Sequence, residues 1–148
     1  MKTYLKKGYS KEWINQRLKS IEIRKELTDE WEKRGVKEGS EFAILTNEMT
    51  EAWSGLTTKE YKNLKGLKKE NLRDNMANLE LVLNMLAETV TKEISEKEEP
   101  NNFEQNKRVA RKGGGVAYRT RKDIESKTGK PAITEKNAKN ILAGKNKK

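Results

Sequence analysis

Apolar residues recur at helical spacing in the middle of the chain. The spacings alternate between four and three over nearly three heptads, and Ile94 continues the line formed by Leu72, Met76, Leu79, Leu83, Leu86 and Val90. A stripe of this kind is typical of a buried central helix or of one strand of a helical dimer seam. The sequence therefore predicts a long helix here, which serves as core or as a self-association surface.

Capping residues divide the preceding part of the chain into shorter helices. Ser10 suits the N-cap of a helix that ends near Gly35, and Ser40 is placed to begin another. Thr57 and Glu60 have the spacing of a capping box at the start of a short helical turn. We expect three helical pieces before the long helix.

The C-terminal third is expected to be helical only in part. We predict a link over 96–102 that contains Pro100, a helix over 103–128, an extended stretch over 130–134, a last turn over 137–142 and a disordered end over 145–148. The predicted fold class is all-α: an extended multi-helix bundle with a long central helix and a basic C-terminal helix and tail. The bundle is dimeric if the long helix is a seam.

A helix over 103–128 has two different faces. Its packing stripe consists of Val109, Gly113, Val116, Ala117, Thr120 and Ile124. The opposite side collects a basic ridge with one aromatic ring and one glycine: Lys107, Arg108, Arg111, Lys112, Gly115, Tyr118, Arg119 and Lys122. The pattern predicts that one face packs while the ridge binds nucleic acid or an acidic surface.

Three consecutive glycines interrupt this helical pattern. Each interior glycine costs a helix about 1 kcal/mol relative to alanine. Gly113 and Ala117 form a pair of small residues that would let another helix approach closely. The alternative is that the triplet is a break or a hinge.

The basic charge lies at one end of the chain. Residues 1–100 carry 19 Lys/Arg and 19 Asp/Glu, whereas residues 101–148 carry 14 and 4, which accounts for the whole net charge of +10. We therefore divide the chain into a charge-balanced helical body over 1–100 and a basic helix, extended segment and tail over 101–148, expected to pack on the same domain. A polycationic segment favours a polyanionic partner, such as DNA, RNA or an acidic protein face.

The composition limits the size of the core. Leu, Ile, Val and Phe make up 28 of the 148 residues, close to the range of disordered proteins of high charge. The three tryptophans and the helical periodicity argue against full disorder. We expect a homo-oligomer that completes its core by self-association. The chain shows no membrane span and no signal peptide, so we expect a cytoplasmic protein with no membrane partner.

The residue types present restrict the chemistry. The chain has no Cys and no His, which excludes disulfides, Cys or His nucleophile pairs and the usual zinc sites. Asp123, Glu125 and Lys127 have the letters of a nuclease motif, but on a helix Glu125 points away from the other two. The glycine triplet matches no phosphate-binding loop. We expect no enzyme, no catalytic residue, no metal and no cofactor.

Several long strings resemble one bacterial family. They are 9–17 (YSKEWINQR), 24–31 (RKELTDEW), 41–46 (EFAILT), 53–61 (WSGLTTKEY), 64–76 (LKGLKKENLRDNM), 111–114 (RKGG) and 127–130 (KTGK). This pattern is similar to the C-terminal region of DNA-damage-inducible protein D and of related phage antirepressor-like proteins. The matched strings run from about Lys7 to Asn137.

The resemblance implies a biological process but no particular biochemical activity. Members of this family usually carry an N-terminal BRO-type domain associated with DNA binding, and several belong to the DNA-damage (SOS) response of bacteria or their phages. This chain starts near where that domain would end, so sequence-specific DNA recognition is not carried over. We expect a stand-alone C-terminal module or a fragment of a longer protein.

The resemblance leads to two hypotheses of function, and the motif of Asp123, Glu125 and Lys127 leads to a third. The first is a nonenzymatic regulatory module of the DNA-damage or prophage response, which contacts a repressor or a recombinase filament and binds DNA non-specifically. The second is a phage counter-defence inhibitor of a host nucleoprotein complex. The third is a metal-dependent nuclease.

Overall fold

The computed structural model describes residues 4–5 and 7–141 and is all-α. Its helices are α2 (Lys11–Lys33), α3 (Ser40–Ser54), α4 (Thr58–Leu64), the 3-10 helix η1 (Arg73–Asn75), α5 (Asn78–Glu98) and α6 (Phe103–Thr128). No strand occurs in the described part of the chain. The predicted fold class is therefore correct.

The helix boundaries follow local capping chemistry. The Ser10 hydroxyl accepts a hydrogen bond from the backbone N–H of Trp13 (3.1 Å) at the start of α2, and Gly35 follows the helix with a φ of 83°. Thr57 and Glu60 form the predicted capping box at the start of α4. Single polar side chains thus fix where these helices begin.

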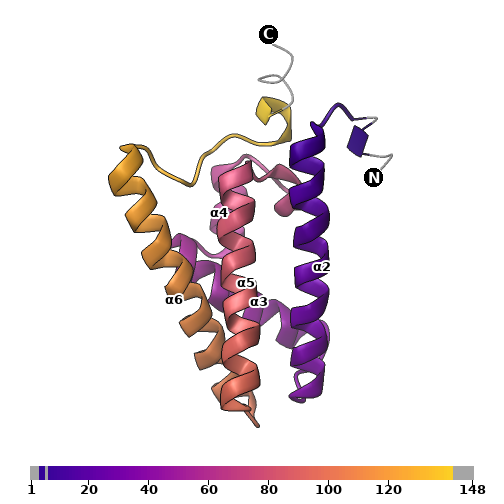
Figure 1. Cartoon of the computed structure of the whole chain (residues 1–148). Helices are drawn as coiled ribbons and strands as arrows, with labels where there is room; N and C mark the ends of the chain where they lie inside the picture. The colour runs from indigo at the N-terminus through magenta and orange to yellow at the C-terminus, as the bar shows by residue number, and fades with distance from the viewer. Residues whose placement is uncertain (1–3, 6, 142–148) are drawn as a thin grey trace.

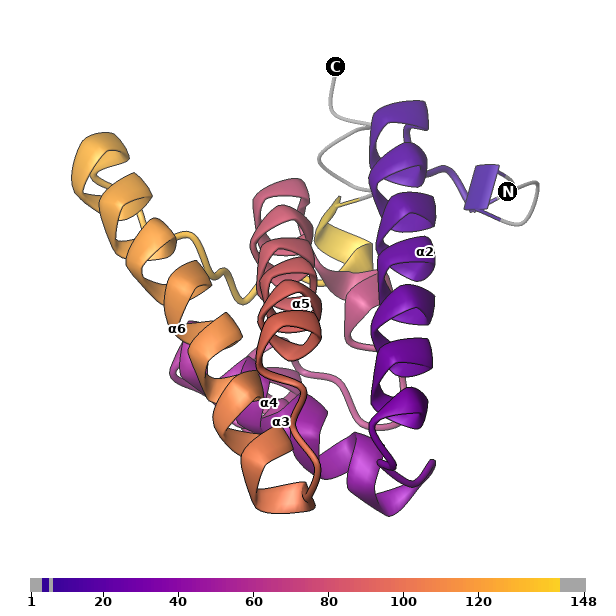
Figure 2. The ribbon, with the colours of Figure 1, turned by 60° about the horizontal axis from the view of Figure 1, so that its bottom comes forward.

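Helix α5 stands at the centre of the bundle. It packs against α2 on one side and α6 on the other, while α3 crosses behind it and also contacts α6 (Figure 1). The view in Figure 2 shows α6, α5 and α2 side by side, with α3 running across their ends. None of the described helices combines the length and the apolar character needed to cross a bilayer.

The predicted long helix starts later than the apolar stripe suggested. Helix α5 begins at Asn78, so Leu72 and Met76 precede it. The segment before α5 is held in a turn because the Asn71 side chain accepts a hydrogen bond from the backbone N–H of Asp74 (3.1 Å). The Trp13 indole N–H donates to the Met76 carbonyl (2.9 Å), which ties the segment to α2.

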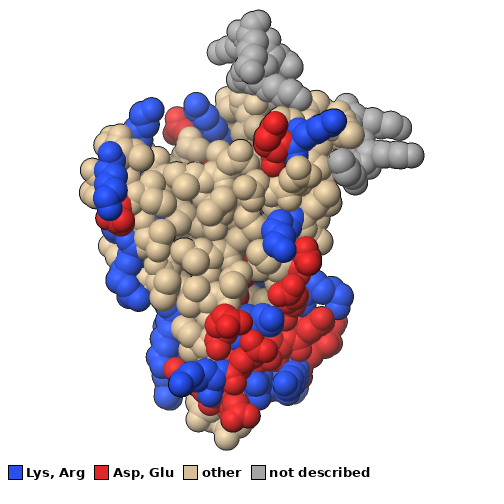
Figure 3. Space-filling model, in the orientation of Figure 1, with Lys and Arg blue, Asp and Glu red and all other residues tan. Residues whose placement is uncertain are grey.

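The stripe itself is divided between core and surface. Leu72, Met76 and Leu83 are buried, and Leu86 and Val90 are half-buried. Leu79 is 37% exposed, so it is not a core residue, and its neighbour Val82 is 42% exposed. Figure 3 shows mainly uncharged atoms over much of the face on which α5 lies. Leu79 and Val82 thus form the exposed apolar face of α5.

The buried side of α5 is largely polar. Its buried polar residues follow one another at helical spacing: Glu80, Asn84, Glu88, Thr91 and Ser95. The Glu80 carboxylate accepts a hydrogen bond from the Lys65 ammonium (2.9 Å) and another from the Tyr61 hydroxyl. Burial and the nearby carboxylate raise the pKa of Tyr61, so the phenol stays protonated. The core is therefore built from ion pairs as well as apolar contacts.

The segment after α6 returns to the bundle. The Lys65 ammonium donates to the backbone carbonyls of Thr134 (2.7 Å) and Lys136 (2.6 Å), and residues 138–141 form a helical turn. The predicted last turn over 137–142 is present as far as it can be followed. The predicted disorder of 145–148 lies outside the described residues.

Candidate nucleic-acid interface

Helix α6 continues without a break through the three glycines. A β-carbon added at Gly113 would lie 1.8 Å from Thr91 Oγ1, and one at Gly114 would lie 2.6 Å from both the Met49 carbonyl oxygen and Ala52 Cβ. The missing side chains therefore let α6 approach α5 and α3 at backbone distance. Of the two interpretations offered by the sequence, the structure has the close helix approach and not the hinge.

The rest of the predicted packing stripe faces the bundle to different degrees. Val109 and Ala117 are buried, whereas Val116 and Ile124 are half-buried. Gly114 lies outside the predicted stripe, yet it is buried and, like Gly113, leaves no room for a β-carbon. Gly113 faces Thr91 on α5, whereas Gly114 faces Met49 and Ala52 on α3, so α6 packs on two sides and one helical stripe did not include both glycines.

The basic ridge lies on the open side of α6. Figure 3 shows Lys and Arg side chains along the edge of the molecule where α6 lies. Most ridge residues are exposed, while Lys107 and Gly115 are half-buried. The structure thus brings the predicted ridge residues together on one helix face.

Acidic neighbours compensate part of the ridge. Arg111 donates two hydrogen bonds to Glu48 on α3 (3.1 and 3.0 Å), and these bonds lower the pKa of the Glu48 carboxyl. Lys112 forms an ion pair with Glu98 (2.7 Å). Lys107 and Lys122 have looser contacts with Glu104 (3.5 Å) and Glu125 (3.8 Å). These cations are less available for a ligand than the sequence suggested.

Two guanidinium groups remain uncompensated. Arg108 and Arg119 have no ion pair or side-chain hydrogen bond with any described residue. Arg119 borders an open hollow of about 440 Å³ that Arg111, Lys112 and Gly115 also line. The hollow thus brings three cationic side chains together, a combination that suits a phosphate group.

Tyr118 of α6 is exposed, whereas Arg121 of the same helix is buried. The Tyr118 ring is 39% exposed, and the Lys122 ammonium lies over it at 5.5 Å. Arg121 is buried, and its Nε donates to the Trp53 carbonyl (2.9 Å). Sequence reasoning missed this structural role, because a buried Arg carries no apolar signal.

The acidic residues Asp123 and Glu125 of α6 contact different partners. Asp123 holds Lys127 in an exposed ion pair (2.7 Å). Glu125 instead contacts Arg121 (3.1 Å) and accepts a hydrogen bond from the backbone N–H of Ala132 (2.8 Å). Among the described residues, no three acidic side chains converge as ligands for an ion. The arrangement agrees with the helical geometry that separated Glu125 from its neighbours.

The fold and this site define an all-α protein with an exposed, partly neutralised cationic helix. Residues 9–141 match the model of the DinD C-terminal domain, and the chain belongs to that family. Membership indicates a DinD-like role related to DNA damage. No curated protein and no solved structure matches the chain.

Proposed function

We propose that this chain is a nonenzymatic regulatory module of the bacterial DNA-damage or prophage response, which acts in the cytoplasm by protein–protein contact with accessory affinity for nucleic acid. Membership of the DinD C-terminal domain family supports the setting. Its proposed partners are DNA, bound without sequence preference, and a protein such as a repressor or a recombinase filament.

The observation that carries the nucleic-acid part is the pair of uncompensated guanidinium groups on α6. Arg111 and Lys112 must loosen their contacts with Glu48 and Glu98 before they bind a phosphate. Arg108 and Arg119 need no such exchange, so they contribute most to the affinity. Phosphate contacts position a protein on a duplex without distinguishing bases, which accounts for the lack of sequence preference.

A fluorescence-anisotropy titration with labelled duplex DNA tests this part. Neutralising both groups with Arg108→Gln and Arg119→Gln should weaken binding to all sequences alike. It should also reduce the salt dependence by about 0.9 in slope for each phosphate that the variant no longer neutralises. A matched control, Lys11→Gln with Lys33→Gln, removes two exposed charges from α2 and should leave the affinity almost unchanged.

Each part of the proposed function has an outcome that would contradict it. If micromolar protein shifts neither duplex nor single-stranded DNA at about 50 mM salt, a concentration low enough to favour phosphate contacts, the ridge does not bind nucleic acid. Affinity capture from a bacterial lysate, with and without nuclease, tests the protein contact. A partner retained after nuclease treatment supports direct contact, while loss of every partner on nuclease treatment contradicts it.

A further inference from the structure

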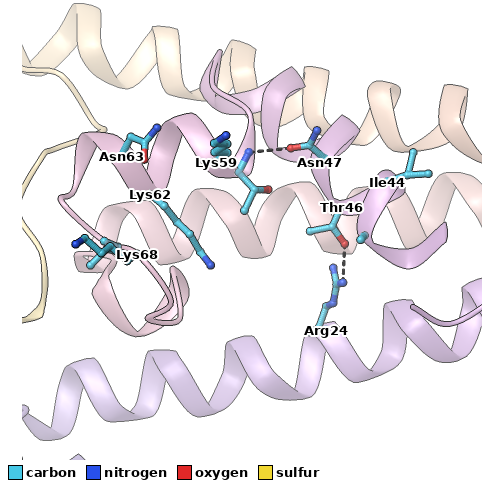
Figure 4. A pocket seen from close by; sticks show the side chains of 11 residues that line it. Arg24, Ile44, Thr46, Asn47, Lys59, Lys62, Asn63 and Lys68 are labelled. Carbon is cyan, nitrogen blue, oxygen red and sulfur yellow. Dashed lines mark hydrogen bonds between the residues drawn. The ribbon is translucent and has the colours of Figure 1, made fainter. Parts of the chain in front are cut away.

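An open pocket of about 750 Å³ lies between α2, α3, α4 and the turn that follows α4. This volume is within the roughly 300–1,000 Å³ of typical ligand sites. Figure 4 shows the lining side chains: Arg24 on α2, Thr46 and Asn47 on α3, and Lys59 and Lys62 on α4. The pocket is formed by helices of the charge-balanced body and lacks any residue of α6.

The charges that line this pocket are all positive. Lys59, Lys62 and Lys68 line it, and none of them has an ion pair or side-chain hydrogen bond with a described residue. Lys62 is half-buried. Glu70 lies close by, but its carboxylate accepts hydrogen bonds from the backbone N–H groups of Lys68 (2.8 Å) and Lys69 (3.0 Å). The pocket therefore has cationic side chains available and no lining carboxylate.

The walls are fixed before any ligand binds. Arg24 donates a hydrogen bond to the Thr46 hydroxyl (2.6 Å) and pairs with the buried Glu88 (3.2 Å). The backbone N–H of Thr58 donates to the side-chain oxygen of Asn47 (2.8 Å), which joins α4 to α3. A preformed site loses less entropy on binding, so these contacts favour a ligand.

The apolar part of the pocket is aliphatic. Ile44 is 43% exposed, and Ala43 and the buried Leu67 also line the pocket. None of the described lining residues is aromatic. Nucleobases are usually held by stacking on aromatic rings, which this pocket does not offer. An aliphatic side chain next to carboxylates fits the surface better.

We propose that this pocket binds an acidic peptide segment of a partner protein, with an aliphatic residue against Ile44 and carboxylates against the three lysines. This proposal deepens the protein-contact part of the proposed function and rests on it. It places that contact on the body of the protein, away from the ridge of α6.

A binding titration of the whole chain with a labelled peptide tests the proposal. The probe is a peptide of about eight residues, with Leu at its centre and Asp and Glu on both sides, long enough for a grooved site. Lys59→Gln, Lys62→Gln and Lys68→Gln together should weaken binding about tenfold or more at low salt, since the charge complementarity is removed. Ile44→Asn should weaken it several-fold at any salt concentration.

Matched controls separate the pocket from general charge. Lys11→Gln, Lys33→Gln and Lys97→Gln remove three exposed charges elsewhere and should leave the affinity within about twofold, because distant exposed charges are screened. Two further probes need no altered protein: one peptide has Ser in place of Leu, and the other has Asn and Gln in place of Asp and Glu. Both should bind more weakly to the unaltered chain.

Several results would overturn the proposal. They are no saturable binding of the acidic peptide by the unaltered chain, equal binding of all three peptides, or unchanged binding by the lysine variant. Displacement of the peptide by a short single-stranded DNA, abolished by the same lysine substitutions, would show a nucleic-acid pocket instead. Because Arg108→Gln with Arg119→Gln should leave peptide binding intact, failure of the ridge and failure of the pocket are distinguishable.

Discussion

The three consecutive glycines of α6 should respond to alanine with opposite signs. At Gly113 the added β-carbon would lie 1.8 Å from Thr91 Oγ1 and 2.8 Å from Thr91 Cα. At Gly114 the added β-carbon would lie 2.6 Å from the Met49 carbonyl oxygen on α3. At Gly115 the nearest atom is Arg119 Nη1 at 3.7 Å, which is ordinary contact with a flexible side chain.

The magnitudes follow from two competing effects. Alanine favours a helix interior by about 1 kcal/mol over glycine. Overpacking a well-packed site costs about 1–3 kcal/mol, and the upper end applies where backbone atoms must move. Gly113→Ala and Gly114→Ala should therefore lower the free energy of unfolding by about 2 kcal/mol each. Gly115→Ala should raise it by up to about 1 kcal/mol.

Urea denaturation followed by circular dichroism measures all three variants on one scale. Thr91→Ala removes the closest atom, so combining it with Gly113→Ala should recover part of the stability, and the double-mutant cycle should show coupling. Stability of Gly113→Ala or Gly114→Ala equal to that of the unaltered chain would refute the close packing of α6. A drop in stability in Gly115→Ala would refute the open position.

Three further predictions concern the core, the charge pair between α3 and α6, and the exposed face of α5. Lys65→Met should lower the free energy of unfolding by about 3–5 kcal/mol, because it leaves the Glu80 carboxylate buried without its cation; a decrease below about 1 kcal/mol in urea denaturation would contradict this. The pKa of Glu48 is lowered by Arg111, so the pair stabilises the fold above the ordinary value of 4.5 and this contribution disappears as the pH falls through the lowered pKa. Glu48→Gln should therefore cost about 0.5 kcal/mol at neutral pH and nothing in strong acid, and an equal cost at both pH values would argue against the pair. If the exposed face of α5 mediates self-association, Val82→Glu should lower the mass measured by light scattering without unfolding the chain, whereas a concentration-independent monomer in the unaltered protein would exclude it.

Local signals in the sequence were sufficient for much of the secondary structure. Ser10 and the pair Thr57 and Glu60 act through contacts within one helical turn, so their role is visible in the sequence. The predicted start of α5 was several residues too early, because the apolar stripe includes Leu72 and Met76, which precede the helix. Polar contacts to the backbone and to α2 hold this preceding segment out of the helix, and apolar periodicity does not detect such contacts.

The pocket lined by Lys59, Lys62 and Lys68 had only a weak signal in the sequence, because the net charge was summed over a long stretch of the chain. Lys59, Lys62, Lys65 and Lys68 recur every three residues, and the sum over residues 1–100 is nevertheless zero. The structure turns Lys65 inward to Glu80 and leaves the other three at the pocket. A charge count over a short window would have indicated the basic stretch over 59–68. It would not have predicted that Lys65 points inward, because that orientation depends on Glu80, which lies in another helix.

The polar interior also bears on self-association. The small apolar supply suggested that the chain needs a second copy to complete its core. Buried pairs between separate elements, such as Lys65 with Glu80 and Arg24 with Glu88, fill part of that interior within one chain. Such pairs contribute little net stability compared with apolar packing, but each requires a specific partner and so restricts how the helices dock. A homo-oligomer is therefore supported by the exposed apolar surface of α5 alone, and not by the composition of the chain.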